Sequence, residues 1–168
     1  MPNRDRALLH TLSVYVANKP GALARIAQIF ARRGFNIESL VVSPAIDGQF
    51  SRMTISCSGN PVGLDQIIKQ LSKLIDVLHC IDHTSDTSVM KEMGLVKIAV
   101  DCEGRSEALQ IAEHFGCKTV DLTPESMILQ VVGNPAKIDA LEEMIAKFKV
   151  IELVRTGKVV MSRGQQMT

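Results

Sequence analysis

The sequence predicts an α+β protein made of two tandem ferredoxin-like βαββαβ domains. Three observations support this prediction. Apolar residues follow the order strand, helix, strand, strand, helix, strand, that order occurs twice, and a polar segment separates the two copies. The chain has 168 residues, enough for two small domains. The predicted domains span residues 8–83 and 91–164, and the predicted linker spans 84–90.

The first domain begins with a predicted half-buried strand at 8–17, where apolar and polar residues alternate. A helix follows, because the next apolar residues recur at helical spacing and Gly34 then fits a helix C-terminal cap. The other predicted elements of this domain are strands at 35–43, 50–58 and 77–81 and a helix that opens at Pro61. Both helices need the same face of one antiparallel sheet, because each has a single apolar stripe to bury.

The second domain repeats the pattern of the first. Its predicted elements are strands at 95–100, 119–122, 127–132 and 150–161 and helices at 106–115 and 136–148. Gly157 allows a break in the last strand. The tripeptide Gly59-Asn60-Pro61 recurs as Gly133-Asn134-Pro135. An Asn N-cap followed by Pro is also common at helix starts, which would explain the tripeptide alone. It does not explain why the order of six elements repeats, so an internal repeat is predicted.

Composition excludes several classes of function. The net charge is +1 with scattered Lys and Arg, which gives no basic surface for nucleic acid or membranes. No apolar run approaches the ~20 residues of a membrane span. The four cysteines follow no paired spacing, so they are expected to be reduced thiols, and the expected location is the cytoplasm.

The turn Asn18-Lys19-Pro20-Gly21 is the candidate functional motif. It joins a strand to a helix, and the first amides of a helix have no intrahelical partner and attract anions. The backbone amides of Gly21, Ala22 and Leu23 are therefore candidates to hold a carboxylate, with Asn18 contacting either charged end of an amino acid. The alternative is an ordinary turn, in which Pro begins the helix and Gly relieves crowding.

No catalytic or metal-binding residue is predicted. The sequence contains no Ser-His-Asp set, phosphate-binding glycine loop or dinucleotide fingerprint. His79, Cys80 and His83, with Cys57, lack the four-ligand spacing of a structural zinc site.

The quoted turn and the residues after it resemble an ACT domain. The run Arg33-Gly34-Phe35-Asn36-Ile37-Glu38-Ser39-Leu40 is more specific: it resembles the regulatory small subunits of acetohydroxyacid synthase, also called acetolactate synthase. The resemblance spans nearly the whole chain, from Leu9 to Gly164. It implies that the N-terminal domain is an ACT domain.

The resemblance also implies a function, namely feedback regulation of branched-chain amino acid biosynthesis. The chain is expected to form a homodimer and to bind valine between subunits, at Asn18, Gly21, Ala22 and Leu23 of one copy and Asn36 and Ile37 of the other. The partner is expected to be a catalytic large subunit that carries thiamine diphosphate, magnesium and FAD. The second domain lacks the Asn-x-Pro-Gly turn, having Asp101-Cys102-Glu103-Gly104-Arg105 instead, so it is not expected to bind the same amino acid.

Two alternatives stay open. One is a stand-alone amino-acid sensor without an enzyme partner. The other is a small acyl-phosphate hydrolase on the same fold, which is disfavoured because the Asn18–Gly21 turn contains Lys19 but no Arg to hold a phosphate.

Overall fold

The computed structural model describes residues 9–85 and 88–168, and it divides into two compact units. The first unit comprises residues 1–89 and 158–168, and the second comprises 90–157. This division differs from the predicted boundary at 164, because the chain after residue 157 belongs with the first unit. The predictions for residues 1–8 and for positions 86–87 of the linker lie outside the described residues.

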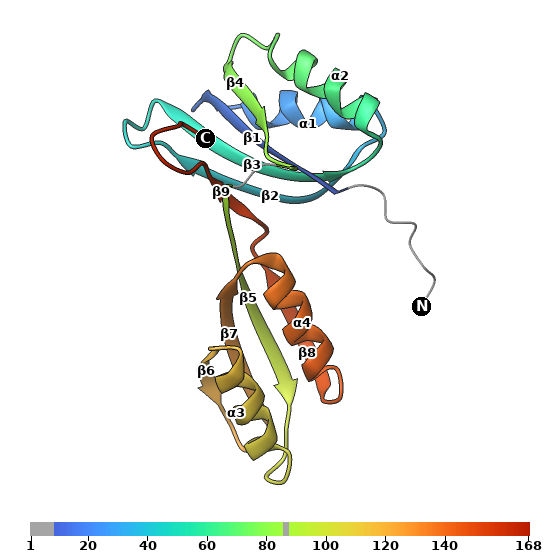
Figure 1. Ribbon diagram of the computed structural model, residues 1–168, viewed down its shortest axis with the longest axis vertical. Coiled ribbons are helices and arrows are strands. Elements are labelled where there is room, and N and C mark those ends of the chain that lie inside the picture. The colour runs from blue at the N-terminus through green and yellow to red at the C-terminus, as the bar shows by residue number, and fades with distance from the viewer. Residues whose placement is uncertain (1–8, 86–87) are drawn as a thin grey trace. The chain divides into compact units, whose positions relative to one another are not determined.

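The first unit is a four-stranded antiparallel sheet with two helices. Its elements are β1 (Leu9–Ala17), α1 (Ala22–Arg32), β2 (Asn36–Pro44), β3 (Phe50–Ser58), α2 (Pro61–Leu71) and β4 (Val77–Asp82). The strand order is β2-β3-β1-β4, which makes β2 and β4 the edge strands. Figure 1 shows α1 and α2 above this sheet, as the two apolar helix stripes require.

The core of the first unit is mostly aliphatic and lies between the sheet and its helices. Leu12, Val14 and Val16 lie on one face of β1 and are fully buried, and Ile26 and Phe30 meet them from α1. Thr11 and Ser13, on the opposite face, are buried as well, so the prediction of a half-buried strand is wrong for this part of β1.

Phe35 fixes the start of α2 against the sheet. A β-carbon placed on Gly63 would lie 2.7 Å from the Phe35 ring, and one placed on Gly59 would lie closer still. Such distances are too short for any side chain, so these two positions admit only glycine while Phe35 keeps its place. Asn60, between them, caps α2 by accepting a hydrogen bond of 2.6 Å from the Gly63 amide.

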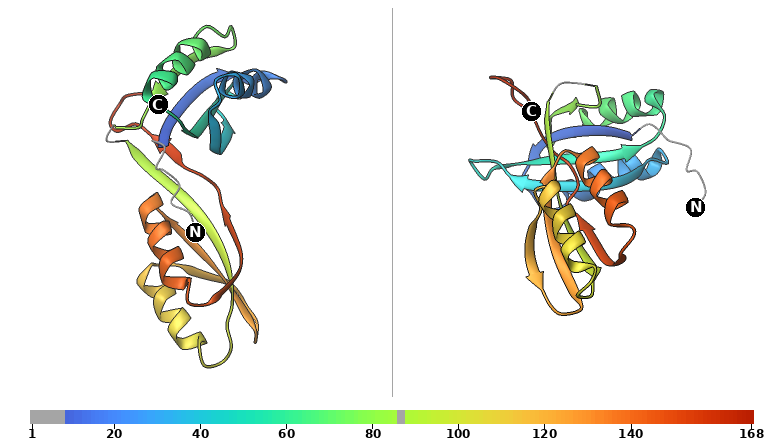
Figure 2. Two further views of the ribbon diagram at one scale, coloured as in Figure 1. Left: turned by 90° about the vertical axis from the view of Figure 1, so that its right-hand side faces the viewer. Right: turned by 60° about the horizontal axis from the view of Figure 1, so that its bottom comes forward.

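The second unit repeats the topology of the first. Its elements are β5 (Val89–Ala99), α3 (Arg105–His114), β6 (Lys118–Leu122), β7 (Ser126–Gly133), α4 (Pro135–Ile145) and β8 (Lys149–Arg155). The order β6-β7-β5-β8 corresponds strand for strand to β2-β3-β1-β4. Helices α3 and α4 lie on one face of this sheet (Figure 2). The predicted tandem βαββαβ fold is thereby confirmed.

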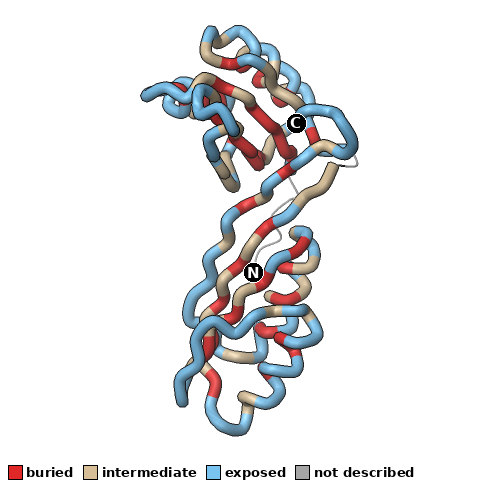
Figure 3. Tube along the Cα trace, turned by 90° about the vertical axis from the view of Figure 1, so that its left-hand side faces the viewer, coloured by how far each residue is buried: buried red, intermediate tan, exposed pale blue. Residues whose placement is uncertain are grey.

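Buried and more exposed residues alternate along β5 and β7 of the second unit, and Figure 3 colours the chain by burial. In β5, for example, Val96 and Ile98 are fully buried and their neighbours are half-buried. One polar group is also buried here: Glu92 receives two hydrogen bonds of 2.9 Å from the guanidinium of Arg155, in a bidentate ion pair.

The predicted strand 150–161 is two strands, β8 and β9 (Val159–Met161), and they are separated at Gly157, where the sequence allowed a break and where the backbone has a φ of +85°. One sequence prediction needs correction in detail. The predicted linker 84–90 overlaps β5, which already begins at Val89. Within the described part of the chain, no helix is both long enough and apolar enough to span a membrane.

Candidate functional site

The turn before α1 has a glycine in a conformation that other residues adopt at a cost. Gly21 is the N-cap of α1 and has a φ of +82°, in the left-handed region. The helix itself begins at Ala22, so the interpretation of Pro20 as its first residue is wrong. Pro20 instead lies within the turn that leads to the N-cap.

The first amides of α1 are only partly engaged. The Ala22 amide donates to the Lys19 carbonyl at 3.3 Å, so the prediction that it is free for a ligand needs correction. The amides of Gly21 and Leu23 have no hydrogen-bond partner among the residues that the structure describes. Free donors therefore remain on both sides of Ala22, at the positive end of the helix dipole.

Side chains cap two of the other three helices: Asn60 caps α2, and Asn134 caps α4 at 2.9 Å from the Lys137 amide. Helix α3 has no side-chain cap, but the amide of its N-cap residue, Gly104, donates to the Asp101 carboxylate at 2.8 Å. No side chain caps α1, and its first turn holds no acidic residue. The turn before α3 is the equivalent of the α1 turn, and it thus contains a carboxylate of the chain itself, that of Asp101.

Asn18 links the turn to the β2–β3 hairpin. Its side-chain Nδ2 donates to the Gly48 carbonyl at 3.1 Å, and its backbone amide donates to the Gln49 carbonyl at 2.8 Å. The carboxamide oxygen has no hydrogen bond within the described residues, and one Nδ2 hydrogen is left beside the bond to Gly48. Asn18 can therefore accept from an ammonium group or donate to a carboxylate.

Arg25 and Asp76 complete the surroundings of the turn, and sequence reasoning missed both. A β-carbon on Gly21 would lie 3.4 Å from Nη1 of Arg25, whose Nη2 forms an ion pair with Asp76. The Asp76 carbonyl in turn accepts from the Ala17 amide at 2.7 Å. Arg25 follows Gly21 by one helical turn, a spacing that could have identified it.

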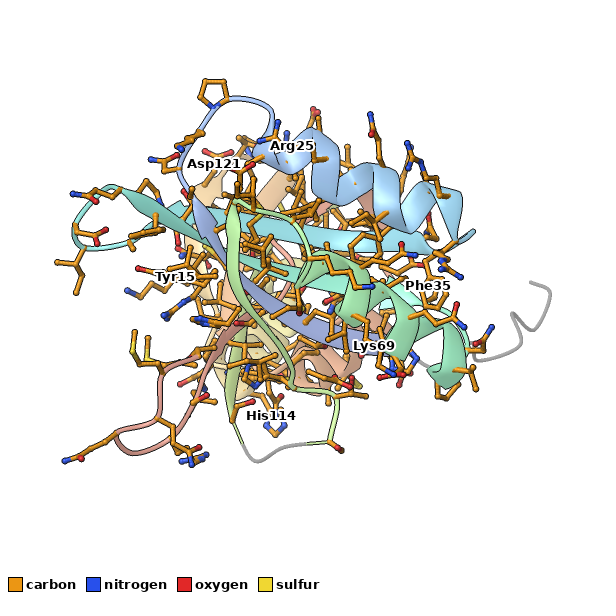
Figure 4. The ribbon with its side chains drawn as sticks, turned by 90° about the horizontal axis from the view of Figure 1, so that it is seen from above. Tyr15, Arg25, Phe35, Lys69, His114 and Asp121 are labelled. Atoms are coloured by element: carbon orange, nitrogen blue, oxygen red, sulfur yellow. The ribbon has the colours of Figure 1, made fainter. Side chains whose placement is uncertain are left out.

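Asn36 and Ile37 lie at the other end of the sheet. Asn36 pairs with Ser58, the last residue of β3, whereas Ala17, next to Asn18, pairs with Phe50, the first residue of β3. At about 3.4 Å per residue this separates the two groups by about 27 Å. Figure 4 shows Tyr15 and Phe35 correspondingly far apart on the first unit. One copy of the chain therefore does not bring the predicted site residues together.

Asn36 is exposed and its Nδ2 donates to Glu38 at 2.8 Å, and Glu38 also accepts from Ser58 at 2.7 Å. Ile37 is half-buried against the first core. These contacts fix the start of the edge strand β2 and leave one amide hydrogen and the oxygen of Asn36 for a further contact.

The candidate metal ligands do not assemble. In the described ranges, no group of three or more His, Cys, Asp or Glu residues is placed to hold a metal ion. Burial raises the pKa of the Cys57 thiol to about 11 and that of Cys80 to about 12. These thiols are therefore protonated at neutral pH and poor nucleophiles.

Comparisons with known proteins match both units. The family described as the small subunit of acetolactate synthase matches residues 91–164, and the AHAS (acetohydroxyacid synthase) small subunit-like ACT domain matches residues 12–79. The acetolactate synthase small subunit of Mycobacterium bovis is 42% identical over 155 residues, which cover 92% of each chain. A probable acetolactate synthase small subunit of Archaeoglobus fulgidus is 40% identical over 157 residues, covering 94% of this chain and 98% of the relative.

A solved structure extends the match to the fold. The crystal structure of the acetolactate synthase small subunit from Thermotoga maritima has a TM-score of 0.83 and 34% sequence identity. The match covers 94% of this chain and 99% of the Thermotoga chain. Sequence and fold agree along nearly the full length, so the chain belongs to the acetolactate synthase small subunit family, and its first unit is the ACT domain of that family.

Proposed function

We propose that this chain activates a catalytic large subunit of acetolactate synthase and transmits feedback inhibition by valine or a related branched-chain amino acid. The observation that carries the proposal is the α1 turn in a chain of this family. Its amides at Gly21 and Leu23 are free among the described residues, and no side chain of the protein caps the helix. An amino-acid carboxylate fits these donors and the dipole.

A second copy of the chain would complete the site. β2 is an edge strand. If β2 pairs antiparallel with β2 of a second copy and the two Leu40 residues lie opposite each other, each Asn36 lies opposite Pro44 of the other copy. Pro44 pairs with Ser51, next to Phe50 at the Asn18 end of the sheet. The Asn36 end of one copy thus reaches the same end of the sheet as the α1 turn of the other. With this register a homodimer would have two effector sites at its seam, and the edge position of β2 supports such pairing.

The proposed site divides its contacts by chemistry. The carboxylate accepts from the amides of Gly21 and Leu23, and the Asn18 oxygen accepts from the ammonium group. The Leu23 side chain, 40% exposed, and Ile37 of the second copy offer apolar surface for the aliphatic side chain. Arg25 adds a positive charge beside the carboxylate.

Regulation then follows from differential affinity. The effector shifts the enzyme toward a less active arrangement only as far as it binds that arrangement more tightly. Coupling free energies of about 1–3 kcal/mol, or about 5–150-fold, are typical of such systems. Thiamine diphosphate, magnesium and FAD belong, in this proposal, to the large subunit, and this chain contributes no catalytic residue.

Reconstitution tests the proposal. Acetolactate formation by a purified large subunit is measured with increasing amounts of this chain, with and without valine, and valine, leucine and isoleucine are titrated calorimetrically into the chain alone. We expect activation on addition, inhibition by at least one of the three amino acids, and binding of that amino acid. A large subunit whose activity is unchanged by this chain would refute the proposed function, and activation without binding of any of the three would refute the effector site.

A further inference from the structure

The helix-free face of the ACT sheet carries a row of stacked side chains. His79, Tyr15 and Arg52 are register neighbours on β4, β1 and β3. The Tyr15 ring stacks on His79 at 5.1 Å and on Phe50 at 5.3 Å, and the Arg52 guanidinium carbon lies 5.8 Å from the Tyr15 ring centre. The row holds the Arg52 side chain in a defined position on an aromatic surface.

A cavity of about 450 Å³ opens beside this row, entirely within the first unit. Its lining is mostly apolar and comes from the row, the β2–β3 hairpin and the C-terminal segment: Tyr15, Ser43, Pro44, Ala45, Ile46, Asp47, Arg52, Met161 and Met167. Within the described residues, Arg52 forms no ion pair, and its buried Nε has no hydrogen-bond partner. The cavity therefore combines mostly apolar walls with two charged residues, Asp47 and Arg52, and Arg52 forms no ion pair with Asp47 or with any other described residue.

The hairpin at the rim of the cavity ends in an apolar tip. Ile46 is fully exposed, although large aliphatic side chains are favoured inside proteins. The loop around it is ordered by its own hydrogen bonds: the Ala45 amide donates to the Phe50 carbonyl at 2.8 Å, and the Gly48 amide donates to the Ala45 carbonyl at 2.9 Å. A single exposed apolar residue is ordinary on a protein surface, so what indicates an interaction surface here is the combination of Ile46 with the mostly apolar cavity beside it.

The same hairpin is bonded directly to the effector turn. Asn18 donates one hydrogen bond from its side chain to Gly48 and one from its backbone to Gln49. An amino acid that hydrogen-bonds to the Asn18 carboxamide therefore contacts the same side chain that donates to the hairpin at Gly48. Two hydrogen bonds therefore connect the effector turn directly to the hairpin that forms the rim of the cavity.

We propose that the hairpin tip at Ile46 and the cavity at Arg52 form the surface that docks the catalytic large subunit. The occupant is a segment of that subunit with an apolar side chain flanked by a carboxylate. The apolar side chain fills the cavity, whose Met161 and Met167 walls adapt to its shape, and the carboxylate pairs with Arg52. This inference rests on the proposed function, since it names the surface through which activation and inhibition pass.

Matched variants test this surface by titration. Ile46→Asp and Arg52→Gln each remove one half of the proposed contact, and Arg52→Lys keeps the charge. Val62→Asp is the control, because Val62 is also an exposed aliphatic residue, 73% accessible, at the start of α2 near the other end of the sheet. The concentration of each variant that half-activates the large subunit is measured. Calorimetry on the chain alone gives its affinity for the amino acid that inhibits the wild-type pair.

We expect Ile46→Asp and Arg52→Gln to need at least tenfold higher concentrations for half-activation. Arg52→Lys should lie between Arg52→Gln and the wild type, and Val62→Asp should match the wild type. Amino-acid affinity should be retained in all four variants, which also shows that each is folded.

Other results would overturn the inference. Half-activation by Ile46→Asp and Arg52→Gln at the wild-type concentration would exclude this surface as the docking site. A change in the oligomeric state of the free variants, measured by sedimentation, would assign the surface to a second copy instead. Wild-type chain that never activates the large subunit would refute the proposed function itself, and that result is visible before any variant is made.

Discussion

Replacing Gly21 by Asp tests the effector turn most directly. At this position the new carboxylate would point into the space that the proposed effector carboxylate occupies. Two like charges about 4 Å apart near a protein surface repel by about 4 kcal/mol. Since 1.4 kcal/mol corresponds to a factor of ten, this is about a thousandfold in affinity. Arg25, which lies beside Gly21, offsets part of the repulsion, so we expect valine affinity to fall by at least about 100-fold.

Gly21→Ala separates charge from backbone strain. The φ of +82° at position 21 costs an L-residue about 1–2 kcal/mol. Gly21→Asp and Gly21→Ala should therefore both be less stable than the wild type, by a similar amount. The alanine methyl would meet only Nη1 of Arg25, at 3.4 Å, at the end of a flexible side chain. We therefore expect valine affinity of Gly21→Ala to stay within about tenfold of the wild type.

The assay combines calorimetric titration of valine with inhibition of the reconstituted enzyme. Gly21→Asp should still activate the large subunit, because the substitution lies outside the proposed docking surface, but valine should no longer inhibit. A Gly21→Asp variant that binds valine with wild-type affinity would refute the placement of the carboxylate at this turn. Equal loss of affinity in both variants would refute the electrostatic reasoning and attribute the effect to strain.

Three further predictions follow from single contacts. Arg25→Gln should weaken binding of valine by up to about fivefold, as loss of a partly exposed charge pair implies. It should not weaken binding of valinamide, in which a neutral amide replaces the carboxylate, and equal weakening of both ligands in calorimetry would exclude a role for the Arg25 charge. Gly59→Ala should lower the free energy of unfolding, measured in urea, by about 1–3 kcal/mol, because the new methyl group would overpack against the Phe35 ring. Adding Phe35→Leu should recover part of this loss. An unchanged urea midpoint in Gly59→Ala would contradict the close contact between Gly59 and Phe35. Burial raises the pKa of the Cys57 thiol from 9.0 to about 11, so this thiol ionises at lower pH in the unfolded chain than in the folded one. The free energy of unfolding should therefore fall as pH rises from 9 to 11, and it should fall less steeply in Cys57→Ala. Equal dependence on pH in both proteins would show that this thiol does not contribute.

Local chemistry in the sequence was enough to predict the elements of the fold. Asn60 and Asn134, each followed by Pro, predict the starts of α2 and α4, and both side chains cap those helices. Gly34 has the positive φ that a helix C-terminal cap requires. These signals act between residues a few positions apart, and the repeat of six elements needs only the order in which they occur. For that reason the tandem fold was predictable before any contact was known.

The composition of the site depended on contacts between distant residues. Asn18 meets Gly48 across 30 residues and Arg25 meets Asp76 across 51, so no local pattern shows either pair. The strand register places Asn18 and Asn36 at opposite ends of β3, which the predicted residue set alone did not reveal. The sequence by itself determined which two helices begin with an Asn cap followed by Pro. Only tertiary structure decided what that turn touches, because strand pairing, and not sequence spacing, determines which loops meet at one end of a sheet.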